Sequence, residues 1–211
     1  MNKNRPLVLI DLDRTLFHTD MFKTDLVAAL ATLSHMDVEE LYETLADARQ
    51  GSGLTSSVHL THVVHTTGTG LGAVTQTLTS LGHDYLYPDG VKLLDKLDSA
   101  GADVVILTYG EAAMQTLKLA LCPRLAPYTA HIVLGRKNAY IANSWPRRFG
   151  TLIDDKQGQE LPNNWNEITI RRGAEKTQHH HSWWTIGDLE QAWPIIETLQ
   201  EVPEDKTTQK G

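Results

Sequence analysis

Two aspartates, Asp11 and Asp13, stand where a short apolar segment ends, and they are the residues of this chain best suited to chemistry. The run Leu7–Ile10 before them is rich in branched apolar side chains, which is typical of a strand buried on both faces. Because the two acids are two residues apart, their carboxylates point the same way from an extended backbone. Neighbouring carboxylates repel one another unless a cation or a proton lies between them. A hard divalent ion bound through oxygen atoms, such as Mg²⁺, meets this requirement.

Polar residues also follow three later segments that are predicted to be strands. These residues are Thr108 and Tyr109 after the apolar run 103–107, Arg136 and Lys137 after 131–134, and Asp154 and Asp155 after 149–153. Apolar runs that alternate with amphipathic segments predict a parallel sheet with helices on both faces. In such an open α/β sheet, ligands bind at the carboxyl ends of the strands. We therefore expect these hydroxyl, cationic and acidic groups to gather around Asp11 and Asp13.

The four groups, taken in order, resemble the four motifs of the haloacid dehalogenase-like (HAD) phosphohydrolases. The sequence Asp11-Leu12-Asp13-Arg14-Thr15 after an apolar strand resembles the first motif, and the resemblance covers roughly residues 6–17 and 88–199. It implies an α/β fold with a doubly wound parallel sheet, the Rossmann-like core of that superfamily. It also implies that Asp11 is a nucleophile that forms an aspartyl-phosphate, and that Asp13 is a general acid and base.

The resemblance further implies how a phosphate would be bound. Thr108 and Tyr109 are expected to contact the phosphate, with the hydroxyl of Thr108 donating to a phosphate oxygen. Lys137 is expected to bring positive charge to the phosphate and to Asp11, because phosphoryl transfer concentrates negative charge on the equatorial oxygens. Arg136 is the alternative cation, since it stands beside Lys137.

A magnesium site is also implied by the resemblance. Asp155, with Asp154 beside it, is expected to complete the Mg²⁺ site together with Asp11 and the backbone carbonyl of Asp13. Arg14 departs from the pattern, because many relatives have glycine at this position. It adds bulk near the mouth of the site without entering the chemistry.

Residues 19–85 carry apolar stripes at helical spacing and no convincing strand. This block resembles the helical cap that many of these hydrolases insert over the active site, where a lid would exclude water. Residues 1–18 and 86–202 are expected to form the core, and residues 203–211 a flexible tail. We expect Asp20 to cap the first inserted helix.

Two groups of histidines are open to interpretation. His59, His62 and His65 would spread around a helix, so a solvated polar face is the ordinary interpretation and a metal site the alternative. The run His179-His180-His181 is interpreted as a polar loop that leads into a packed pair of tryptophans. A metal or substrate role remains open there.

Composition narrows the class of protein. The chain has 211 residues, a formal net charge of −7 and one cysteine, Cys122. The acidic balance disfavours broad binding to nucleic acid. A single cysteine cannot form an internal disulfide, which suits a reducing cytoplasm. The first apolar run is too short for a signal peptide or a membrane span. We expect a cytoplasmic protein without a membrane or nucleic-acid partner.

The resemblance thus predicts Mg²⁺-dependent hydrolysis of a small phosphorylated metabolite, a phosphomonoester, through an aspartyl-phosphate. A 2-haloacid dehalogenase would also use Asp11 as nucleophile, but it needs neither a metal nor an acid at Asp13. A signalling receiver also places Asp, Thr and Lys around an aspartyl-phosphate, but it lacks this first motif and a helical insertion of this size. A non-catalytic homologue that binds a phosphate or metabolite is the third alternative, although every residue type that catalysis requires is present.

Overall fold

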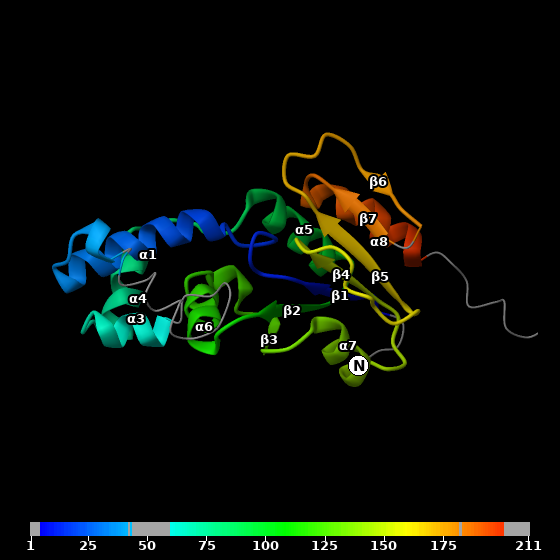
Figure 1. Cartoon of the computed structure of the whole chain (residues 1–211). Coiled ribbons are helices and arrows are strands. Elements are labelled where there is room, and N and C mark those ends of the chain that lie inside the picture. The colour runs from blue at the N-terminus through cyan, green and yellow to red at the C-terminus, as the bar shows by residue number, and fades with distance from the viewer. Residues whose placement is uncertain (1–4, 42, 44–59, 182, 201–211) are drawn as a thin grey trace, which may run out of the picture.

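A computed structural model describes residues 5–41, 43, 60–181 and 183–200 of the chain (Figure 1). The elements in chain order are β1 (Leu7–Ile10), α1 (Thr19–Ser34), α3 (Leu60–Thr66), α4 (Leu71–Ser80), α5 (Pro88–Ser99), β2 (Asp103–Tyr109), α6 (Ala112–Ala120), the 3₁₀ turn η1 (Pro123–Leu125), β3 (Thr129–Val133), α7 (Lys137–Ser144), β4 (Gly150–Asp154), β5 (Trp165–Ile170), β6 (Gln178–His179), β7 (Trp183–Ile186), the 3₁₀ turn η2 (Leu189–Gln191) and α8 (Ala192–Gln200).

The strands form one seven-stranded sheet in the order β3-β2-β1-β4-β5-β7-β6. Every neighbouring pair is parallel except β6 and β7, which are antiparallel. Strand β1 lies between β2 and β4, with Ile10 in register with Ile106 on one side and Ile153 on the other. The predicted α/β class with a doubly wound parallel sheet is therefore confirmed.

The sheet has an apolar layer on each face. Because side chains alternate along a strand, Val8 and Ile10 face one side of β1 while Leu7 and Leu9 face the other. The first face packs against α5 and α8, and the second packs against Ile141 of α7. All four β1 side chains are buried, as the run of branched apolar residues predicts for a central strand.

The inserted helices α1, α3 and α4 lie together beside the core (Figure 1), and α1 packs against α4. The two connections between them and the core run side by side, because Phe17 bridges to Leu86 and the N–H of His18 donates to the Tyr85 carbonyl at 2.7 Å. The prediction that helices fill this region holds for its described residues. The domain boundaries themselves stay predictions.

Local details differ from the expectations at several places. Helix α1 begins at Thr19 and is capped by the His18 imidazole, which accepts from the N–H of Met21, so Asp20 lies in the first turn and is not the cap. A further helical segment begins after Asp37, whose carboxylate accepts from the N–H of Glu40 at 2.7 Å. Residues 42 and 44–59, which follow it, lie outside the described residues.

Three elements of the core were not predicted from the sequence. Helix α7 starts directly at Lys137, where only the end of a strand was expected. The segment predicted to be a loop before the tryptophans forms the hairpin of β6 and β7. Across this hairpin His179 stacks on Trp184, with ring centroids 3.9 Å apart.

None of the helices in the described part of the chain has the length and apolar character needed to cross a membrane.

Candidate active site

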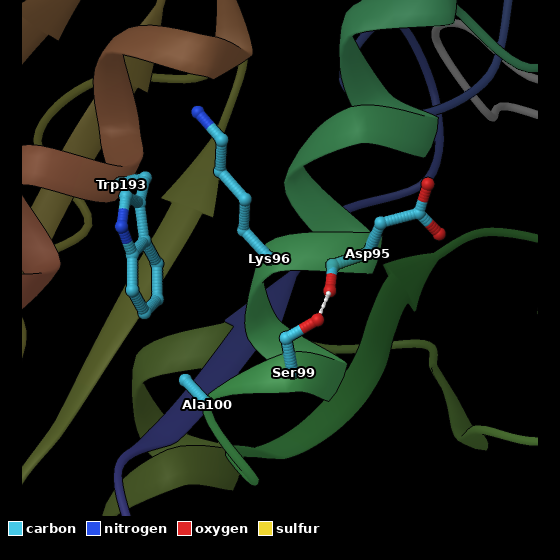
Figure 2. Close-up of a pocket in the computed structure, with 5 residues that line it drawn as sticks. All are labelled: Asp95, Lys96, Ser99, Ala100 and Trp193. Carbon is cyan, nitrogen blue, oxygen red and sulfur yellow. Dashed lines mark hydrogen bonds between the residues drawn. The ribbon is translucent and has the colours of Figure 1, made fainter.

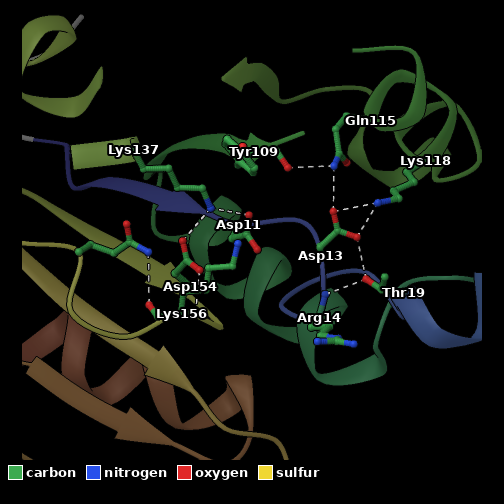
Figure 3. A network of polar contacts seen from close by, with 11 residues as sticks. Asp11, Asp13, Arg14, Thr19, Tyr109, Gln115, Lys118, Lys137, Asp154 and Lys156 are labelled. Atoms are coloured by element: carbon green, nitrogen blue, oxygen red, sulfur yellow. Dashed lines mark hydrogen bonds and ion pairs between the residues drawn. The ribbon is translucent and has the colours of Figure 1, made fainter. Parts of the chain in front are cut away.

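The carboxyl ends of β1 and β4 bring the first and last predicted groups together. Asp11 follows β1 and Asp154 ends β4, and the N–H of Asp11 donates to the Ile153 carbonyl at 2.9 Å. The parallel pairing of the two strands places both acids at the same edge of the sheet. Figure 3 shows Asp11 and Asp154 facing each other there, with the Lys137 side chain reaching in from above.

Lys137 joins the two buried acids. Its Nζ lies 2.5 Å from Asp11 Oδ1 and 2.7 Å from Asp154 Oδ2. Burial would lower the pKa of this ammonium, but the two carboxylates raise it above its ordinary value, so the lysine is charged. Arg136, the alternative cation, is exposed and lies 3.8 Å from Glu160. The position of Lys137 beside Asp11 is the one that the sequence analysis favoured.

Three carboxylates crowd this edge of the sheet. One oxygen from each of Asp11, Asp154 and Asp155 lies within 4.8 Å of the others, and no other cluster of three or more potential metal-ligating side chains occurs among the described residues. Burial raises the pKa of the Asp11 carboxyl, and Asp154 raises it further, against the opposing effect of Lys137. Burial and the neighbouring Asp154 likewise raise the pKa of Asp155, to about 6.

Crowded carboxylates with raised pKa values fit a divalent cation, because a bound ion removes their repulsion. The Asp154 carboxylate is already engaged, since one oxygen accepts from Lys137 and the other accepts from the N–H of Lys156 at 2.9 Å. Asp155 is half-buried beside it. This arrangement is consistent with Asp11 and Asp155 as the residues that would hold Mg²⁺, with Asp154 fixed behind them by Lys137.

Thr108, near the end of β2, carries a buried hydroxyl without a hydrogen-bond partner among the residues that the structure describes. A buried polar group without a partner is costly, so this hydroxyl is available to a ligand bound at the end of the strand. The neighbouring Tyr109 is exposed, and the Lys156 ammonium lies 5.5 Å from its ring centroid. The Thr108 hydroxyl thus fits the predicted phosphate contact, while the Tyr109 ring lies open at the end of the strand.

The second aspartate of the motif is oriented differently from the first. The Asp13 carboxylate points toward α6 and α1, away from the group formed by Asp11, Lys137 and Asp154 (Figure 3). Its partners are Lys118, Gln115 and Thr19, all within 2.9 Å. Burial alone would raise the pKa of Asp13, but the Lys118 ammonium and the hydrogen bonds lower it below its ordinary value.

Arg172, just after β5, was not predicted from the sequence to contact the first motif. Its guanidinium donates to the carbonyls of Arg14 and Thr15 at 3.2 and 2.5 Å and pairs with Asp89 at 2.9 Å. It also stacks on Tyr87, 3.3 Å from the ring centroid. One side chain therefore binds the backbone directly after Asp13 and the start of α5.

The acidic cluster contains none of the histidines whose side chains the structure describes. His59 lies outside the described residues, and His65 is exposed at the end of α3. A surface hollow lined by Asp95, Lys96, Ser99, Ala100 and Trp193 lies between α5 and α8 (Figure 2). It lies at the end of α5 that leads into β2, opposite to the edge where the strands end in acids.

No family model and no curated protein matches the sequence. Solved structures do match. A haloacid dehalogenase-like protein from Burkholderia xenovorans LB400 is 17% identical, with 94% of this chain and 100% of that chain covered and a TM-score of 0.64. A 2-haloacid dehalogenase from Pseudomonas syringae pv. Tomato is 17% identical, with 92% and 98% covered and a TM-score of 0.61.

The HAD-like protein YfnB from Bacillus subtilis, solved bound to magnesium, is 14% identical, with 91% and 98% of the two chains covered and a TM-score of 0.54. The chain therefore has the fold of the haloacid dehalogenase-like superfamily. This confirms at the level of fold the resemblance that the four motifs carry. The structures that share the fold include both a magnesium-bound protein and a dehalogenase.

Proposed function

We propose that this protein is a Mg²⁺-dependent phosphohydrolase that cleaves a small phosphomonoester through an aspartyl-phosphate. The observation that carries the proposal is the cluster of Asp11, Asp154 and Asp155, within 4.8 Å of one another, beside the charged Lys137. Mg²⁺ bound there would neutralise the carboxylates and the phosphoryl oxygens. The magnesium in YfnB, a protein of the same fold, supports this choice of ion.

The side chains would act in two steps. In the first, an Asp11 oxygen bonds to phosphorus while the bond to the leaving oxygen breaks, and Asp13 gives that oxygen a proton. In the second, water attacks phosphorus, Asp13 takes its proton, and the Asp11–phosphorus bond breaks. Lys137 and the Thr108 hydroxyl would hold the negative charge of the phosphoryl oxygens. For both steps the Asp13 carboxylate has to rotate from α6 toward Asp11, and leaving the Lys118 ammonium, which lowers its pKa, would allow it to take up the proton that it gives.

The alternative is dehalogenation, in which Asp11 would displace a halide from carbon. It is favoured by the similarity to a 2-haloacid dehalogenase structure. Dehalogenation does not explain the raised pKa values of Asp11 and Asp155, because that reaction needs no metal. The acidic cluster therefore supports the phosphohydrolase over the dehalogenase.

The test is hydrolysis of p-nitrophenyl phosphate and of a panel of metabolite phosphomonoesters by purified protein, with Mg²⁺ or with EDTA. Parallel reactions with 2-chloropropionate would measure chloride release. We expect phosphate release that requires Mg²⁺ and is lost in Asp11→Asn. The matched control is Asp95→Asn, which removes an exposed acid on α5 and should leave the rate unchanged.

Three outcomes would contradict the proposal. Chloride release without phosphate release would establish the dehalogenase instead. Phosphate release that is indifferent to both EDTA and Asp11→Asn would refute the mechanism. A folded protein that releases neither product across the panel would point to a non-catalytic homologue that binds a phosphate or metabolite.

A further inference from the structure

The loop between β4 and β5, residues 155–164, begins with the proposed metal ligand Asp155 and is tied to β5 by a buried acid. That acid is Glu167, the one charged residue of β5. We infer that β5 positions this loop, and with it Asp155, for Mg²⁺, and that Glu167 is the principal positioning residue. The inference rests on the proposed function, because it concerns the magnesium site on which that function depends.

Glu167 lies on the face of the sheet that α7 covers. It is two residues from Trp165 along β5, so the two side chains share a face, and Trp165 belongs to the apolar layer there. In register, Glu167 lies between Leu152 of β4 and Trp183 of β7, and it is buried. Burial disfavours the charge of an acid, so an apolar side chain would be less costly at this place. The acid is therefore expected to have a role that an apolar residue could not fill.

The carboxylate of Glu167 accepts hydrogen bonds from two successive backbone groups of the loop. The N–H of Gly158 donates to Oε1 at 2.8 Å, and the N–H of Gln159 donates to Oε2 at 3.2 Å. Gly158 has a φ of 76°, a left-handed conformation that lets successive N–H groups face one anion. Burial raises the pKa of the Glu167 carboxyl, and the two N–H groups oppose that rise because they favour the ionised form.

The same loop is held at its start by the acidic cluster. Asp154 ends β4, and its Oδ1 accepts from the N–H of Lys156 at 2.9 Å, which turns the chain directly after the strand. Asp155 lies between these two residues and three residues before Gly158. The backbone is therefore fixed on both sides of Asp155, on one side by Asp154 and on the other by Glu167.

Strand β5 has a second contact with the loop, at the surface. Arg171 directly follows β5, and its guanidinium donates to the side-chain oxygen of Gln157 at 2.6 Å. The backbone N–H of Arg171 donates to the Ile186 carbonyl of β7 at 2.7 Å, so the base of this side chain is fixed to the sheet. Glu167 on the face of the sheet and Arg171 at its edge together hold three consecutive residues, 157–159.

The consequence for Mg²⁺ is that the site is ordered before the ion arrives. One oxygen of Asp155 already lies within 4.8 Å of oxygens of Asp11 and Asp154. If the loop were free, only the fraction of molecules with Asp155 in place could bind the ion, and the measured affinity would fall by that fraction. Loss of the Glu167 contacts should therefore weaken Mg²⁺ binding although every ligand is still present.

The first experiment measures the Kd of Mg²⁺ by isothermal titration calorimetry for metal-free wild type, Glu167→Gln and Glu160→Gln. In Glu167→Gln an NH₂ group replaces one oxygen and cannot accept from a backbone N–H, so one of the two contacts is lost. We expect the Kd to rise by at least about tenfold, the lower end of the range for residues that orient metal ligands. Glu160→Gln is the matched control and should leave the Kd unchanged, because Glu160 is an acid of the same loop that is 75% exposed and lies 3.8 Å from Arg136.

The second experiment uses p-nitrophenyl phosphate to separate positioning from a merely structural role. In Glu167→Gln the Mg²⁺ concentration that gives half the maximal rate should rise by the same factor, about tenfold. At saturating Mg²⁺, kcat should return to within about twofold of wild type, because excess ion draws the loop into its ordered position. A kcat that Mg²⁺ does not restore, together with an unchanged Kd, would overturn the positioning role.

A third measurement needs neither metal nor activity. Lys156 is exposed in this loop, so trypsin can cleave after it when the loop opens. Cleavage after Lys156 in metal-free Glu167→Gln should be at least about tenfold faster than in wild type, the effect of one hydrogen bond to a charged group. Equal rates of cleavage would overturn the contact between Glu167 and the loop.

The outcomes distinguish this inference from the proposed function. Equal Kd values for Mg²⁺ in wild type and Glu167→Gln would overturn the positioning role and leave the proposed function standing. Wild type that binds no Mg²⁺ would refute the proposed function, and this role with it. If Glu167→Gln does not fold, Arg171→Met gives the same calorimetric test from the surface, with an expected rise in Kd of about threefold. An unchanged Kd in Arg171→Met would then overturn the role of β5.

Discussion

Adding Mg²⁺ to metal-free protein is expected to raise its unfolding temperature, and the gain should depend on Asp155 and on pH. A ligand that binds only the folded state at one hundred times its Kd stabilises that state by about 2.7 kcal/mol. For a chain of this size each kcal/mol corresponds to about 2–4 °C. The expected rise at pH 7.5 is therefore about 5–10 °C.

The pH dependence follows from the pKa of Asp155, which is raised from 3.8 to about 6 in the folded protein. The folded state keeps this proton to a higher pH than the unfolded state does. The free energy of unfolding of the metal-free protein should therefore fall as the pH rises from about 4 to about 6. Because the side chain is partly exposed, screening limits this loss to about 1 kcal/mol. At pH 5, competition from the proton on Asp155 alone should weaken Mg²⁺ binding about tenfold and remove about 1.4 kcal/mol of the stabilisation, and the raised pKa of Asp11 adds to this loss.

The assay is thermal unfolding after dialysis against EDTA, at pH 5 and 7.5, with and without Mg²⁺. Asp155→Asn should lose most of the gain at pH 7.5, while Asp95→Asn, at an exposed position on α5, should keep it. Ca²⁺ provides a further comparison, since it also prefers oxygen ligands. A gain of the same size in Asp155→Asn, or one that does not change with pH, would refute the assignment of this cluster as a metal site.

Two further changes test the backbone around the first motif. Arg14 has a φ of 59°, a left-handed conformation that costs a non-glycine residue about 1–2 kcal/mol, so Arg14→Gly should keep or slightly raise the free energy of unfolding in urea. A loss of more than about 1 kcal/mol would show that the arginine side chain outweighs the backbone strain. Arg172→Ala should lower the free energy of unfolding by about 2–4 kcal/mol. The substitution leaves the Thr15 carbonyl without its donor and Asp89 without its cation, and it removes the guanidinium stacked on Tyr87. Arg172→Lys should recover less than half of that loss, and a lysine variant as stable as wild type would contradict this role of the guanidinium.

The features that could be predicted from the sequence are those that depend on consecutive residues. The apolar run before Asp11 predicts both a buried strand and the position of the acid at its end, because burial and strand direction are local properties. The same holds for Thr108 and Asp154, and parallel pairing then brings the three strand ends together. The position of Lys137 followed from its place after an apolar run, although the start of α7 at that residue was not predicted.

The features that were missed depend on contacts between distant residues. Lys118 and Gln115 lie on a helix whose apolar stripe is the visible pattern, and their partner Asp13 lies more than 100 residues earlier. Arg172 likewise acts on a backbone 157 and 158 residues away. The hairpin of β6 and β7 was missed because its aromatic and histidine side chains show no alternation of apolar and polar residues. Only the packing of the whole chain reveals these contacts.

The central position of β1 has a consequence for how the protein is made. Leu7 lies in register with Asp103 on one side and with Gly150 on the other, so β1 pairs only with strands that are made much later in synthesis. Pairing over such separations in sequence is slow, because long loops must close first. The helices of residues 19–85 are complete well before either partner strand exists. The nascent chain therefore carries an apolar strand with two open edges until β2 is made and with one open edge until β4 is made, and this segment is where chaperones would be expected to act.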